Sequence, residues 1–118
     1  MPLASEASDV GDVYYGRGVQ VYFDGQWQRA EAYFDRATQY SPGDPRPYYF
    51  RGLARSQQGE TFQAESDIRQ GAIIEAGKGF VFPLGSALGA VTGEQRELLD
   101  RIRVEMLANL PAYQDGEG

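Results

Sequence analysis

The sequence predicts an all-α protein in which helical hairpins stack as a solenoid, and three observations support this fold class. Residues 14–18 read YYGRG and residues 48–52 read YYFRG, so one motif returns after 34 positions. Apolar residues recur at three- and four-residue steps, as they do in amphipathic helices. Glycine and proline interrupt these segments where hairpins would turn. A fixed period between about 20 and 50 residues indicates stacked supersecondary units.

The first hairpin is expected within residues 11–44. Residues 1–10 are small and acidic without periodicity, so we expect a flexible lead-in before the helical domain. A first helix is predicted over 12–24, and the following Gly25 favours a turn because glycine adopts positive φ readily. A second helix is predicted over 26–40. Its inward stripe consists of Trp27, Ala30, Phe34 and Ala37.

The second hairpin is expected within residues 45–78 and has the clearest helix start in the chain. Asp44 can cap the helix, and Pro45 follows at the first helical position, where its missing N–H does no harm. The third helix is predicted over 45–58 and the fourth over 60–75, separated by Gly59.

The third hairpin, within residues 79–110, is degenerate. The 34-residue offset reaches an aromatic, a small residue, a glycine and a branched apolar residue in turn, namely Phe82, Ser86, Gly93 and Ile102. Thr92 and Gln95 have the spacing of a capping box at the start of the sixth helix. That helix is expected to stop at Pro111, before an acidic, flexible tail over 111–118.

Composition narrows the function classes. The net charge of −6 and the absence of a basic run argue against nucleic acid and against an anionic membrane surface. There is no cysteine and no histidine, so the commonest metal ligands and general base are missing. We therefore expect no catalytic residue, no metal and no cofactor, and not an enzyme. The start of the chain lacks a basic flank and an apolar run, so we expect a cytoplasmic protein.

Residues 11–110 resemble the tetratricopeptide repeat (TPR) family, whose pattern combines an aromatic, a glycine, an Ala-x-x-x-Phe step and a closing proline. The first unit matches through Tyr14, Arg17, Gly18, Val21, Ala30, Phe34 and Pro42. The second matches through Tyr48, Arg51, Gly52, Arg55, Ala64 and Ile68, but has Ala76 in place of the proline. The third keeps Phe82, Ser86, Gly93 and Ile102, with Leu98 in place of the small alanine. The resemblance implies a right-handed solenoid that binds a protein or peptide in a concave groove.

Most of the repeated motif is expected to serve packing. Gly18 and Gly52 let paired helices approach closely. Repeats similar to these often pair the motif arginine with an aspartate on the second helix, and Asp67 is the expected partner of Arg51. Arg17 and Arg51 are therefore interpreted as orienting the hairpins.

The partner is expected to contact the outward face of the first helix of each hairpin. TPR domains that clamp a terminal carboxylate place lysine, asparagine and arginine there, whereas this face is apolar, so no carboxylate clamp is expected. An amphipathic helix or a hydrophobic extended segment would fit it. The alternative is that these tyrosines pack between neighbouring repeats. The predicted partner-binding residues are Tyr15, Val19, Tyr22, Tyr49, Phe50 and Leu53.

A second hypothesis concerns the sixth helix. Val104 and Leu107 lie off its apolar stripe, although a terminal repeat helix normally has a polar outer face. They are either ordinary exposed apolar residues or a surface for self-association, which would make the chain a component of a homo-oligomeric assembly.

Overall fold

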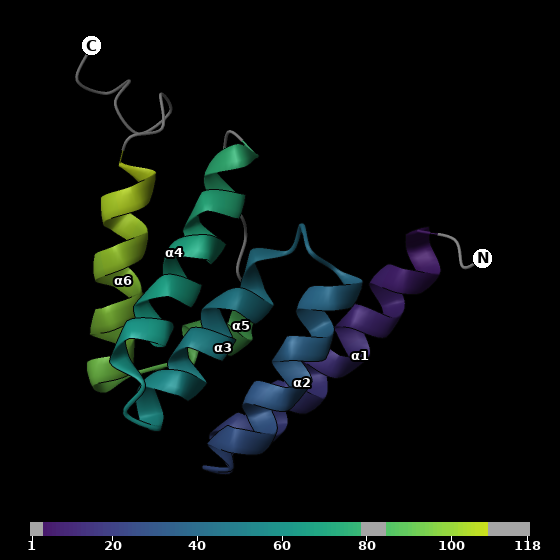
Figure 1. Ribbon diagram of the computed structural model, residues 1–118, viewed down its shortest axis with the longest axis horizontal. Helices are drawn as coiled ribbons and strands as arrows, with labels where there is room; N and C mark the ends of the chain where they lie inside the picture. The colour runs from purple at the N-terminus through teal and green to yellow at the C-terminus, as the bar shows by residue number, and fades with distance from the viewer. Residues whose placement is uncertain (1–3, 79–84, 109–118) are drawn as a thin grey trace.

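The computed structural model describes residues 4–78 and 85–108, and every regular element in these ranges is an α-helix (Figure 1). Consecutive helices pack in sequence: α1 on α2, α2 on α3, α3 on α4, and α4 on α6. This confirms an all-α fold with sequential hairpin packing. The helices are α1 (Ala4–Phe23), α2 (Trp27–Tyr40), α3 (Pro45–Gln57), α4 (Thr61–Gly77), α5 (Gly85–Gly89) and α6 (Gly93–Leu107).

The bounds of α2, α3 and α4 agree with the predicted bounds to within two residues, but α1 begins much earlier than predicted. A Cβ placed on Gly11 would lie 2.1 Å from the Ser41 hydroxyl oxygen, so Gly11 is level with the residue that follows α2. The turns of α1 before Gly11 therefore extend past the end of α2. Because no helix covers them there, they need no apolar stripe, and periodicity could not reveal them.

The turns fall at the predicted glycines. Gly25, Gly59 and Gly93 have φ values of 79°, 83° and 68°, a conformation that favours glycine, and each stands 34 residues after the last. At the start of α3 the Asp44 carboxylate accepts a hydrogen bond of 3.0 Å from the Arg46 backbone N–H, as the predicted cap requires.

The third hairpin departs furthest from expectation. Its first helix is reduced to the five residues of α5, and Thr92 makes no side-chain capping bond to α6, so the predicted capping box is not formed. Phe82, the end of the predicted sixth helix and the tail over 111–118 lie outside the described residues. None of the helices in the described ranges is both long and apolar enough to cross a bilayer.

The paired helices touch where the repeated glycines stand, as predicted. A Cβ on Gly18 would lie 2.6 Å from the Phe34 ring, and one on Gly52 would lie 2.8 Å from the Ala64 backbone oxygen. Behind these contacts lies one buried core. Phe34, Ile68 and Ile102, each 34 residues after the last, are all fully buried in it.

An ion-pair network joins α2, α3 and α4. Arg51 donates to both carboxylate oxygens of Asp67, at 2.9 and 3.1 Å, and to Asp35 at 2.9 Å. Asp67 is largely buried and also accepts from Arg55 at 2.8 Å. The predicted Arg51–Asp67 pair is thus confirmed. Arg17 is exposed and forms no ion pair within the described ranges, so the same role was wrongly assigned to it.

Candidate functional site

Most of the residues predicted to contact a partner are buried. Tyr49, Phe50 and Leu53 have no exposed surface, and Tyr15 and Tyr22 are 8% and 5% exposed. They belong to one apolar cluster with residues of the third hairpin, including Leu88, Val91, Leu99 and Ile102. The residues predicted to line a groove are therefore part of the core, because the third hairpin contributes side chains to the same cluster. Val19 is the predicted groove residue that remains partly exposed.

Tyr49 shows how the third hairpin is held. Its hydroxyl donates a 2.6 Å hydrogen bond to the fully buried Glu75 of α4, and the Arg103 side chain of α6 donates to both oxygens of the same carboxylate, once at 2.9 Å. Burial, reinforced by the bond to Glu75, raises the pKa of Tyr49. The predicted contact residue of the second repeat is thus a structural link between α3, α4 and α6.

Tyr15 occupies the equivalent place in the first hairpin but has different neighbours. The Arg46 guanidinium lies 4.7 Å from the centre of its ring and is itself held by Asp44 at 2.6 Å. Burial raises the pKa of Tyr15 to about 12. Its hydroxyl is buried and finds no hydrogen-bond partner among the described residues.

On the sixth helix the two residues predicted for self-association differ. Leu107 is fully buried, whereas Val104 is 60% exposed. Leu107 therefore contributes to the interior and only Val104 stays available at the surface.

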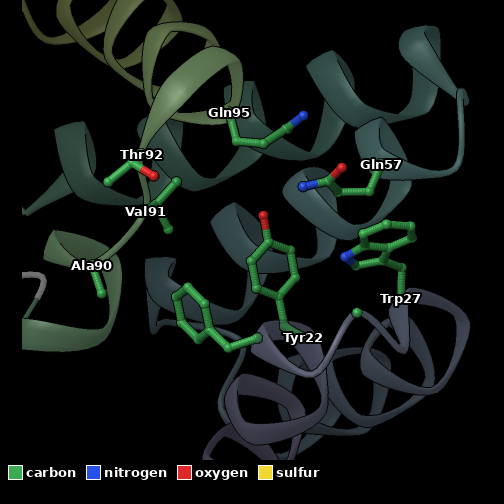
Figure 2. Close-up of a pocket in the computed structure, with 9 residues that line it drawn as sticks. Tyr22, Trp27, Gln57, Ala90, Val91, Thr92 and Gln95 are labelled. Atoms are coloured by element: carbon green, nitrogen blue, oxygen red, sulfur yellow. The ribbon is translucent and has the colours of Figure 1, made fainter.

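A pocket of about 300 Å³ opens where the carboxyl ends of α1 and α3 meet the connection between α5 and α6 (Figure 2). Phe23 and Trp27 stand on either side of the α1–α2 turn, and Phe23 is 48% exposed. The side chains of Tyr22, Trp27 and Gln57 converge on one side, and Ala90, Val91, Thr92 and Gln95 form the other.

The pocket is aromatic and polar but carries no charged side chain among the described residues that line it. Two carboxamides, Gln57 and Gln95, supply both donors and acceptors. The Gln95 side-chain oxygen is buried without a hydrogen-bond partner in the described ranges. Burial raises the pKa of Tyr22, opposed by a hydrogen bond with Gln57, so this phenol is neutral at physiological pH. The pocket suits an uncharged group that brings its own hydrogen-bonding atoms.

Sequence reasoning placed Tyr22 at a binding surface but missed Trp27, Gln57 and Gln95. Trp27 was assigned to the inward stripe of its helix, and it is in fact partly exposed beside the turn. The two glutamines come from segments far apart in the chain and follow no repeat. Only the packing of the third hairpin onto the first two brings them together.

Comparisons with known proteins add no family. No protein-family model, curated protein or solved structure matches the chain. Within the described ranges no group of acidic side chains could hold a metal ion.

Proposed function

We propose that this protein is a non-enzymatic interaction module that binds a peptide or helix of another protein, with an uncharged apolar side chain inserted into the pocket between α1, α3 and α6. The observation that carries the proposal is an uncharged, aromatic-walled pocket with the half-exposed Phe23 at its edge. Aromatic side chains are efficient anchors because they offer a large contact area with few rotatable bonds.

The size and lining of the pocket support a peptide over a cofactor. A volume of about 300 Å³ lies at the lower end of the range typical of ligand sites, so it accommodates one or two side chains. Gln57 and Gln95 can pair with a peptide's backbone N–H and C=O groups, because a carboxamide presents one acceptor and two donors. With no charged group in the lining, a terminal carboxylate would lose its hydration without gaining a counter-charge.

We further propose that the hairpins form a right-handed TPR-like solenoid. The support is the recurrence of the same structural roles at 34-residue steps: turn glycines at Gly25, Gly59 and Gly93, and buried residues at Phe34, Ile68 and Ile102. In this arrangement the third hairpin fills much of the concave face, and the pocket is the part that remains open.

The pocket contains the only tryptophan of the chain, which gives a direct test. The protein is titrated with capped peptides that carry one phenylalanine, leucine, lysine or glutamate in a glycine–serine background, and Trp27 fluorescence is recorded. The phenylalanine and leucine peptides are expected to change the emission saturably, and the charged peptides are not.

Phe23→Ala should weaken this binding about tenfold, the loss expected from removing an aromatic wall contact worth about 1.4 kcal/mol. Phe62→Ala is the matched control, because Phe62 is also an exposed phenylalanine, at 82%, but does not line the pocket. Equal losses in the two variants, or equal binding of the charged peptides, would refute the proposal.

Self-association is the alternative function. Val104 of α6 and Ile73 of the neighbouring α4 are both more than half exposed, at 60% and 51%. Light scattering over a range of concentrations tests it: a constant monomer mass removes the alternative. A mass that rises with concentration and returns to the monomer value in Val104→Ser supports it.

A further inference from the structure

We propose a second binding site, on the outer side of the first hairpin, that takes an acidic helical segment of a partner protein. The site is a hollow of about 260 Å³ lined by Tyr14 of α1 and by Arg29, Ala32, Tyr33 and Arg36 of α2. It shares no lining residue with the uncharged pocket and goes beyond the function proposed above.

The two arginines of this hollow are unusual in being uncompensated. Other arginines, including Arg51 and Arg103, are paired with carboxylates inside the fold. Arg29 and Arg36 are exposed and form no ion pair among the described residues. The guanidinium of Arg29 donates only to the neutral side chain of Gln26, at 2.7 Å. A protein with a net charge of −6 therefore presents two free positive charges at one hollow.

The floor of the hollow is aromatic. The Tyr14 ring is stacked on Tyr40, with centroids 5.7 Å apart, and lies 6.4 Å from Tyr33. These rings fix each other's positions, so the surface between the arginines is rigid and apolar. A partner must then supply an apolar side chain at the centre and negative charges at both ends.

The spacing of the arginines indicates a helical partner. Arg29 and Arg36 are seven residues apart on α2, which places their backbones about 10 Å apart along the helix axis and on one face. A second helix packed along α2 presents two carboxylates at the same distance when they too are seven residues apart. The residues midway between them then face Ala32 and Tyr33. Such a segment is acidic at both ends of an apolar patch.

The opposite side of α2 gives the surface a direction. A second hollow, sharing Ala32 with the first, is lined by Glu31, Asp35 and Glu60 together with Arg55. An acidic helix is repelled on that side and attracted on the other. Charge complementarity thus selects the groove between α1 and α2.

The test uses a labelled, capped, alanine-based helical peptide with two glutamates at the same spacing as Arg29 and Arg36 and a phenylalanine midway between them. A second peptide replaces both glutamates with glutamine. Fluorescence anisotropy is measured at low and at physiological ionic strength. We expect the glutamate peptide to bind the full chain about 3- to 10-fold more tightly at low salt, with a smaller preference at physiological salt.

Arg29→Gln/Arg36→Gln should abolish this preference, and Arg29→Lys/Arg36→Lys should keep part of it. Arg69→Gln/Arg101→Gln is the matched control, because it removes the same charge from exposed positions on α4 and α6. Circular dichroism verifies that each variant is folded. Phe23→Ala, which alters the uncharged pocket, should leave the preference unchanged.

Three results would each overturn the proposal. One is equal binding of the glutamate and glutamine peptides by the wild type. Another is an equal loss in the control double variant, which would make net charge alone responsible. The third is tighter, Arg29- and Arg36-dependent binding of inorganic phosphate or of vesicles containing anionic lipid, which would assign the site to a different ligand class.

Discussion

The first two hairpins have the same helix bounds relative to the repeat and the same glycine contacts, yet they use their charged residues in opposite ways. In the second hairpin Arg51 is fixed by Asp67, whereas the equivalent Arg17 is exposed and unpaired within the described ranges. The cause lies 34 residues before Asp67, where the chain has Tyr33. Exchanging one acid for one tyrosine turns an internal ion-pair site into an aromatic surface.

The same contrast holds for the equivalent tyrosines. Tyr49 donates to the buried Glu75, while the Tyr15 hydroxyl is buried without a partner among the described residues. Glycine and apolar positions set the shared backbone, and polar positions decide which hairpin is interior and which is terminal. The predictions below test this division, beginning with the largest effect.

The largest effect is expected at the buried Glu75–Arg103 pair, which joins the third hairpin to the second. Arg103→Met should lower the free energy of unfolding by about 3–5 kcal/mol, because it leaves the Glu75 carboxylate buried without its cation. Urea denaturation followed by circular dichroism measures this. Glu75→Leu/Arg103→Met removes both charges and should be more stable than Arg103→Met alone. If the double variant is the less stable of the two, the stranded charge is not the cause.

The second prediction compares the motif arginines directly. Arg51→Met should cost about 1–3 kcal/mol, because Asp67 is largely buried and loses one of its two cations. Arg17→Met should change stability by no more than about 0.5 kcal/mol, as is usual for an exposed residue without partners. Thermal melts at matched protein concentration give both values. Equal costs would mean that the two hairpins are held together alike.

The fold was largely predictable from sequence because its determinants are local. The turn glycines, the cap at Asp44 and the apolar stripes each act over one helical turn. The early start of α1 was not predictable, because exposed helical turns leave no periodic pattern. The candidate pocket was not predictable either. Gln57 and Gln95 meet only through the packing of the third hairpin, and burial of Tyr49, Phe50 and Leu53 depends on the same packing.

The third prediction tests the shared part of the two hairpins. Both Gly18→Ala and Gly52→Ala should destabilise the protein, by about 1–3 kcal/mol, because a Cβ at either position overlaps its neighbour. Gly52→Ala should cost more, since its Cβ meets a backbone oxygen of Ala64, whereas Gly18→Ala meets only the Phe34 ring. Urea titration of both variants checks this order. Gly16→Ala is the control, because nothing lies within 4 Å of a Cβ there.

The smallest and most discriminating effect is a difference of sign between the equivalent tyrosines. Tyr49→Phe should destabilise the protein by about 1–3 kcal/mol, because Glu75 loses a buried hydrogen bond. Tyr15→Phe should be neutral or stabilising by about 1 kcal/mol, because it removes a buried hydroxyl that has no partner in the described ranges. Urea denaturation at neutral pH measures both. Destabilisation by Tyr15→Phe would indicate a partner for that hydroxyl.

Alkaline titration sharpens the same comparison, since ionisation of Tyr15 is opposed by folding. Its pKa is raised to about 12, so the phenol is neutral in both states at neutral pH. Between about pH 10, where an unfolded tyrosine ionises, and pH 12, the unfolded state binds fewer protons than the folded state. The stability associated with Tyr15 is therefore fully present below pH 10 and is lost as the pH rises toward 12. Tyr15→Phe should make the decline in stability over this range shallower, while a decline identical to that of the wild type would mean that the buried phenol does not control it.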